Sequence, residues 1–139
     1  MKKKYTLDCG YDYDFDVLAI NSHTKAYKLC WILNKTLGFN FEIVEDHKIN
    51  KELVFTRYKS ENNDGEAINL LSNRSKKGYI IPSQKSVNYF LIINKKNYKT
   101  KKQELLTKLR AINDILLVFE IKTDTEQNSD RFIIHDKKN

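Results

Sequence analysis

The side chains that could act in catalysis or bind a metal are scattered along this chain. Its three histidines are His23, His47 and His135, and none has a second His or Cys at the spacing of a metal site. His23 falls in the first turn of an expected helix, where free N–H groups could meet an anion or where it could simply be solvated. The chain also has no glycine-rich phosphate loop and no nucleophile elbow. We therefore expect no metal, no cofactor and no enzyme activity.

One acidic triplet resembles the start of a calcium-binding loop. Asp12, Asp14 and Asp16 are spaced by two, but Val17 stands where such a loop needs glycine, and His23 stands where it needs a bidentate Glu. Aromatic residues separate the three aspartates, and a strict alternation of aromatic and acidic residues is typical of a half-buried strand. The triplet therefore predicts a strand.

A basic stretch is the clearest candidate for binding. No acidic residue occurs between Glu66 and Glu104. The stretch contains Arg74, Lys76, Lys77, Lys85, Lys95, Lys96, Lys99, Lys101 and Lys102. The candidate anion- or nucleic-acid-binding residues are Arg74, Lys76, Lys77, Lys95, Lys96 and Lys99. Because lysine predominates, contacts would be mostly to phosphates. The alternatives are an ordinary solvated loop at 73–78 and neutralisation of the stretch by the aspartate strand.

Length and composition favour one domain. The chain has 139 residues, of which 40% are apolar and 31% are charged, and its net charge is +7. No apolar run is long enough to span a membrane. The N-terminal lysines are followed by aspartates, which argues against a signal peptide. Two cysteines are too few for a disulfide framework, so we expect a cytoplasmic location.

Apolar patterns place the expected elements. Strands are expected at 11–16 continuing to 20, and at 39–43, 53–58, 67–71, 79–81, 87–93 and 115–121. A helix is expected at 23–37, with Ser22 as its N-cap, Gly38 after its end and Trp31 widening its apolar stripe. A second helix is expected to begin at the capping box Thr100–Gln103.

The order of these elements predicts the fold class. Several consecutive strands without helices between them favour an α+β fold, with a mainly antiparallel sheet of about five to seven strands and two helices packed on one face. Residues 1–122 form the expected domain. Residues 123–139 form a polar tail, in which 132–134 could dock as a short strand.

Three segments of the chain resemble the IPExxxVDY family of Bacteroidetes. They are His23-x-Lys25-x-Tyr27-x-Leu29-Cys30-Trp31-x-Leu33-Asn34, then Leu71-Ser72-Asn73-Arg74 with Gly78-Tyr79, and Ile81-Pro82-Ser83-Gln84-Lys85-Ser86-Val87-Asn88-Tyr89. The likeness covers most of residues 15–121 and implies little about activity. Ser83 and Asn88 replace the two carboxylates of the family's pattern. If those were a catalytic acid and base, this chain would be inactive; the simpler interpretation is that both positions make hydrogen bonds.

These observations favour a non-enzymatic binding domain that engages a protein partner or a larger assembly. The candidate partner surface consists of His23, Lys25, Asn73, Arg74, Pro82 and Tyr89. The alternative is an RNA-binding accessory protein that uses the basic segment 74–102. In neither case do we expect contact with a membrane.

Overall fold

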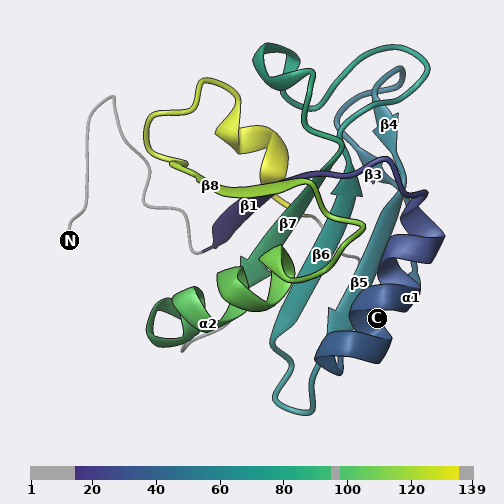
Figure 1. Ribbon diagram of the computed structural model, residues 1–139. Coiled ribbons are helices and arrows are strands. Elements are labelled where there is room, and N and C mark those ends of the chain that lie inside the picture. Colours follow the sequence, from purple (N-terminus) through teal and green to yellow (C-terminus); the bar gives the residue numbers. More distant parts are fainter. Residues whose placement is uncertain (1–14, 95–97, 135–139) are drawn as a thin grey trace.

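The computed structural model describes residues 15–94 and 98–134 and consists of a sheet covered on both faces (Figure 1). The sheet has six strands in the order β2-β5-β6-β7-β1-β8, and all neighbouring strands are antiparallel. Their bounds are β1 (Asp16–Asn21), β2 (Glu42–Ile43), β5 (Arg57–Glu61), β6 (Ala67–Ser72), β7 (Tyr89–Asn94) and β8 (Leu117–Ile121). A separate hairpin joins β3 (His47–Lys48) to β4 (Val54–Phe55). The α+β class expected from the sequence is confirmed.

Helix α1 (Ala26–Leu37) ends where expected but begins three residues late. Gly38 takes a left-handed conformation, with φ 77°, and donates its N–H to the carbonyl of Asn34 at 3.1 Å. Ser22 is not the N-cap, which is Lys25. The Ser22 hydroxyl instead donates to the carbonyl of Asp114 at 2.6 Å, so it ties two loops together.

Helix α2 (Tyr98–Arg110) begins before the expected capping box. Thr100 and Gln103 therefore lie inside the helix, and the capping-box prediction is wrong. Within α2, Glu104 and Lys108 form an ion pair four residues apart, with 3.1 Å between the carboxylate and the ammonium group.

Both helices pack on the same face of the sheet, here called the helix-covered face. From α1 come Leu29, Cys30 and Leu33, and from α2 come Leu106 and Leu109. They meet the sheet residues Leu18, Ile20, Ile68, Leu70, Leu91 and Ile93. Trp31 is not part of this core. It is 58% exposed, so the prediction that it widens the apolar stripe is wrong.

The opposite face, here called the loop-covered face, is covered mostly by irregular chain. Residues Val17, Ala19, Leu71, Phe90 and Ile92 of the sheet pack against residues from the β3–β4 hairpin, from the loop 73–88 and from the segment after β8. This loop contains the 3-10 helix η1 (Pro82–Gln84), and that segment contains the 3-10 helix η2 (Ser129–Phe132).

The segment after β8 docks as a 3-10 helix rather than as a strand. Phe132 is fully buried, and its ring meets that of Phe90 edge-on at 4.9 Å between centroids. Two further strand predictions are corrected. Residues 53–58 divide between β4 and β5, which belong to different sheets, and residues 79–81 contribute only a bridge between Tyr79 and Arg74.

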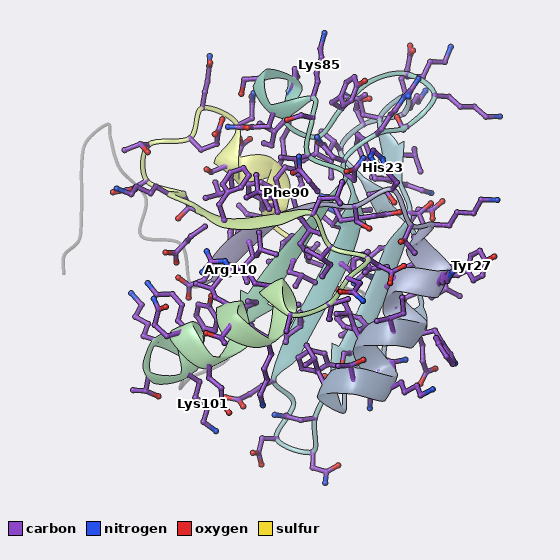
Figure 2. All side chains as sticks on the ribbon, in the orientation of Figure 1. His23, Tyr27, Lys85, Phe90, Lys101 and Arg110 are labelled. Carbon is purple, nitrogen blue, oxygen red and sulfur yellow. The ribbon has the colours of Figure 1, made fainter. Side chains whose placement is uncertain are left out.

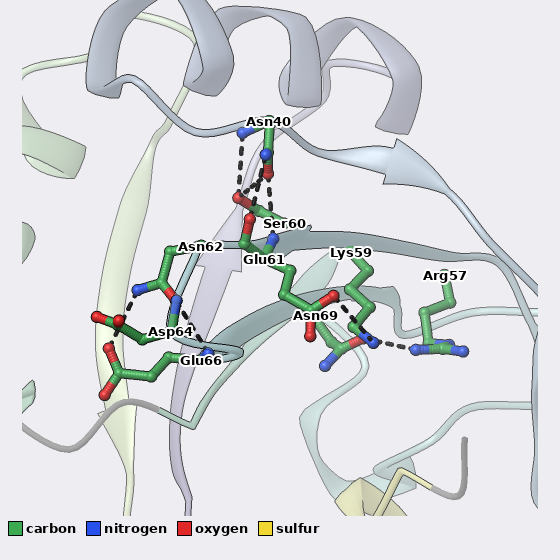
Figure 3. Close-up of polar contacts among 9 residues, drawn as sticks. All are labelled: Asn40, Arg57, Lys59, Ser60, Glu61, Asn62, Asp64, Glu66 and Asn69. Atoms are coloured by element: carbon green, nitrogen blue, oxygen red, sulfur yellow. Dashed lines mark hydrogen bonds and ion pairs between the residues drawn. The ribbon is translucent and has the colours of Figure 1, made fainter. Parts of the chain in front are cut away.

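Hydrogen bonds from polar side chains connect separate segments on the loop-covered face. The Arg57 guanidinium donates to Asn69 Oδ1 at 2.7 Å (Figure 3) and to the carbonyl of Glu45 at 3.1 Å. His47 Nε2 donates to the carbonyl of Arg131 at 2.6 Å, which links the β3–β4 hairpin to η2. The Arg131 guanidinium in turn donates to the carbonyls of Tyr79 and Ile80.

Candidate functional site

The strand register brings four connections to one end of the sheet, here called the loop end. Tyr89 at the start of β7 pairs with Ile20 and Ser72, Leu117 at the start of β8 pairs with Asn21, and Arg57 at the start of β5 pairs with Leu71. The connections 22–25, 44–56, 73–88 and 111–116 therefore meet there. The opposite end, here called the turn end, carries the β5–β6 turn and the start of α2 (Figure 1).

Asn73 holds the longest of these connections in place. Its side-chain amide donates to the carbonyls of Gln84 and Val87, both at 2.9 Å, and its Oδ1 accepts the N–H of Ile81 at 3.0 Å. The side chain is fully buried. Asn73 therefore fixes the conformation of the loop from within and is not a surface residue, which corrects the prediction that it contacts a partner.

Asn88 and Tyr89 hold the connection between β1 and α1. Asn88 Oδ1 accepts the N–H of Ser22 at 2.8 Å, and the Tyr89 hydroxyl donates to the carbonyl of Thr24 at 2.6 Å. Thr24 Oγ1 also donates to the carboxylate of Asp114 at 2.9 Å. Tyr89 is 8% exposed, so it too supports the loop end from inside instead of forming its outer surface.

The other four residues of the predicted partner surface are exposed and share the loop end. His23 and Lys25 lie on the connection into α1, Arg74 follows β6, and Pro82 opens η1. Figure 2 shows His23 beside the loops at this end. The exposed Leu116, whose N–H donates to the carbonyl of Asn21, adds an apolar side chain.

The loop after β6 presents cations at its tip. Arg74 and Tyr79 form a bridge, and the Ser75 N–H donates to the carbonyl of Gly78 at 2.8 Å, so Lys76 and Lys77 project from a tight turn. Both lysines are exposed. Lys85 places its ammonium group 5.8 Å from the ring centre of Tyr79. We call the exposed side chains of Lys25, Arg74, Lys76, Lys77 and Lys85 the loop-end cations.

The structure divides the basic segment 74–102 between the two ends of the sheet. Strand β7 separates the loop-end cations from Lys99, Lys101 and Lys102, which lie in the first turns of α2. Figure 2 shows Lys85 and Lys101 at opposite ends of the molecule. Lys95 and Lys96 lie outside the described residues. The described cations of this segment therefore do not form one surface.

Acidic groups accompany the cations at the turn end. Lys102 lies 3.2 Å from the carboxylate of Glu120. Burial raises the pKa of Asp16, while Lys99 and Lys102 nearby act to lower it. Of the aspartate strand that was expected to neutralise the basic stretch, only Asp16 belongs to the described residues, while Asp12 and Asp14 lie outside them.

A hollow of about 510 Å³ lies at the turn end between the two helices. Leu37, Phe39 and Leu105 supply apolar lining, and Glu104 and Lys101 supply charge. Tyr98 also lines it, and its buried hydroxyl has no hydrogen-bond partner among the described residues. Burial raises the pKa of this hydroxyl above its usual range, as do Glu120 and Asp16. The hollow could not be predicted from the sequence, because its lining comes from stretches that lie far apart in the chain.

Comparisons with known proteins give no relative for this chain. No family model, no curated protein and no solved structure matches it. Within residues 15–94 and 98–134, no three His, Cys, Asp or Glu side chains are grouped so as to hold a metal ion. No helix in the same residues is long and apolar enough to cross a membrane.

The segment that resembles the IPExxxVDY pattern has a structural role at the loop end. Ile81 and Val87 are buried in the core of the loop-covered face. Asn88 accepts a hydrogen bond, as the substitution of a carboxylate by an amide allows. The Ser83 hydroxyl reaches the carboxylate of Glu126 at 3.4 Å, which is a long contact. The family assignment stays a prediction.

Proposed function

We propose that this chain is a non-enzymatic, cytoplasmic binding domain whose partner is a protein, bound at the loop end. The observation that carries the proposal is the internal support of this surface by Asn73, Asn88 and Tyr89. Loops held in one conformation lose little entropy when they bind. The exposed side chains that they carry are therefore ready for a partner.

The charge at the loop end indicates the chemistry of the partner. Lys25, Arg74, Lys76, Lys77 and Lys85 are all exposed. Among the nearby carboxylates, Asp114 is hydrogen-bonded to Thr24, Glu126 lies by Ser83, and Glu52 lines a hollow together with Lys77. A partner with acidic side chains around a small apolar centre would complement these cations and Leu116.

The second candidate is an RNA-binding accessory protein that uses the segment 74–102. The position of Lys85 over the ring of Tyr79 favours it, because an aromatic ring beside a cation is a feature of single-strand binding. The division of the segment between two ends of the sheet favours the protein partner.

Affinity capture from a lysate of the source cells, with and without nuclease, tests the proposal. Lys76→Glu with Lys77→Glu should remove the partner, because it reverses two exposed loop-end cations. The matched control is Lys99→Glu with Lys101→Glu, which makes the same change in charge at the turn end and should retain the partner. Loss of the partner upon nuclease treatment would favour RNA. Equal loss in both variants would contradict a site at the loop end.

A further inference from the structure

The outer face of α1 carries two aromatic rings that the core does not use. Tyr27 is 65% exposed and Trp31 is 58% exposed. Residues four apart are neighbours on one side of a helix, so the two rings share a face. The inner side of α1 supplies Leu29, Cys30 and Leu33 to the core. In Figure 2, Tyr27 points away from the sheet on the outer side of the helix.

Cations surround these rings. Lys28 and Lys35 lie on the same side of α1 and are exposed, and Lys25 is exposed just before the helix. The ammonium group of Lys35 lies 4.9 Å from the ring centre of Trp31. No Asp or Glu occurs from residue 17 to residue 41. The outer face of α1 therefore combines flat aromatic rings with lysines, and the segment 17–41 contains no acidic residue to neutralise them.

We propose that Tyr27, Lys28, Trp31 and Lys35 form a binding face for single-stranded nucleic acid. Unpaired bases stack on exposed aromatic rings whatever their identity, and lysines attract the phosphates between them. This α1 face differs from the loop-end cations, and it shares no residue with the segment 74–102.

The combination of rings and cations favours a nucleic acid over an acidic polypeptide. Carboxylate side chains could pair with Lys28 and Lys35 but have no flat face to cover Tyr27 and Trp31. A single strand supplies the negative charge and the stacking surface in every nucleotide.

The protein contains its own reporter for this proposal, because Trp31 is the only tryptophan in the chain. The full chain is titrated with an oligouridylate of about twelve nucleotides, within the range of single-strand site sizes. Stacking of a base on Trp31 should quench its fluorescence in a saturable way. If Lys28 and Lys35 each neutralise one phosphate, the Kd should rise about sevenfold between about 50 and 200 mM salt.

Variants locate the site by the fluorescence anisotropy of a labelled oligouridylate. Tyr27→Ala should weaken binding at least about fivefold, whereas Tyr27→Phe, which keeps the ring, should not. Lys28→Glu with Lys35→Glu should abolish binding. The matched control, Lys51→Glu with Lys122→Glu, reverses two exposed lysines that lie outside α1 and outside the loop-end cations, so it should bind within about twofold of the parent. Thermal unfolding of each variant shows that it remains folded.

Three results would overturn the proposal. They are an unchanged Trp31 emission at low salt, equal weakening by the control pair, and equally tight quenching by polyglutamate. The second would mean attraction by overall charge, and the third would mean a site for acidic polypeptides. Affinity capture tests the protein partner at the loop end in a separate experiment. Either proposal can therefore be contradicted without the other.

Discussion

Two regular helices cover one face of the sheet, whereas loops, a small hairpin and two 3-10 helices cover the other (Figure 1). Both covers exclude water equally well. Leu29, Leu33 and Leu109 on the helix-covered face are fully buried, and so are Ile81 and Phe132 on the loop-covered face. Helices and irregular loops therefore bury the two faces of the sheet to the same extent.

The two covers differ in how their backbone groups are satisfied. Most N–H and C=O groups of a helix bond within the helix, so α1 and α2 need only an apolar stripe to cover the sheet. Irregular chain has no such internal pattern, and its buried polar groups need specific partners. Asn73, Arg131 and His47 supply them on the loop-covered face. A loop can thus replace a helix as a cover when a few polar side chains are buried with it.

Truncation of one core side chain on each face should have the largest effects. Phe90→Ala on the loop-covered face should cost about 3–5 kcal/mol, and Leu33→Ala on the helix-covered face about 2–5 kcal/mol, since both side chains are fully buried. Urea unfolding measures both. A loss below about 1 kcal/mol, the size of a tolerated swap, would show that the face concerned does not unfold with the rest of the domain.

Removal of the Asn73 side chain should destabilise the loop-covered face next most. Asn73→Ala leaves the carbonyl of Val87 and the N–H of Ile81 without this partner, whereas the carbonyl of Gln84 still accepts the N–H of Val87. Each buried group left unsatisfied costs about 1–3 kcal/mol. We expect a loss of at least about 2 kcal/mol in urea unfolding. Asn113→Ala, at an exposed position, is the control and should change stability by less than about 0.5 kcal/mol. If both variants behave alike, the loop does not depend on its buried amide.

Tyr89→Phe should have a smaller effect, because it removes one hydrogen bond and keeps the ring. The hydroxyl donates to the carbonyl of Thr24 at 2.6 Å, and such a bond contributes about 0.5–1.5 kcal/mol. Thermal unfolding should show this loss, while Tyr27→Phe on the exposed side of α1 should show none. An unchanged melting temperature for Tyr89→Phe would mean that water replaces the hydroxyl.

A pH-dependent comparison should show the smallest effect. Burial, the largest cause, raises the pKa of Asp16 above its ordinary value of 3.8. Folding therefore favours the protonated carboxyl, and stability falls as the pH rises through the carboxyl range. Asp16→Asn should raise the melting temperature at neutral pH, and the gain should shrink below pH 3.8. A gain that grows in acid would contradict the sign of this shift.

The helix-covered face could be predicted from the sequence because its signals are local. The apolar spacing of α1 and the glycine that ends it identify the helix without knowledge of the rest of the fold. The prediction for Trp31 was wrong for a physical reason. Apolar positions along a helix indicate which side faces the core, but they do not show how wide the buried part of that side is. The order of strands and helices was sufficient for the α+β class.

The loop-covered face could not be predicted, because its contacts join segments far apart in the chain. The sequence allowed Phe132 to dock as part of a short strand, but only the structure shows that it packs against Phe90 from a 3-10 helix. The same limit applies to the candidate site. The sequence identified residues that meet at the loop end, but only the folded structure shows that His23, Arg74 and Pro82 are exposed there while Asn73 is buried.

The place of β1 in the sheet has a consequence for the newly made chain. The first described strand lies between β7 and β8, so Val17 pairs with Ile92 and with Ile121, both far later in the chain. During synthesis its run of four fully buried apolar residues has to wait for partners that the ribosome makes near the end. Pairing between residues so far apart in the chain slows folding, and until it occurs the apolar strand stays exposed and prone to aggregate. We expect nascent chains that stop before β7 to aggregate or to require a chaperone.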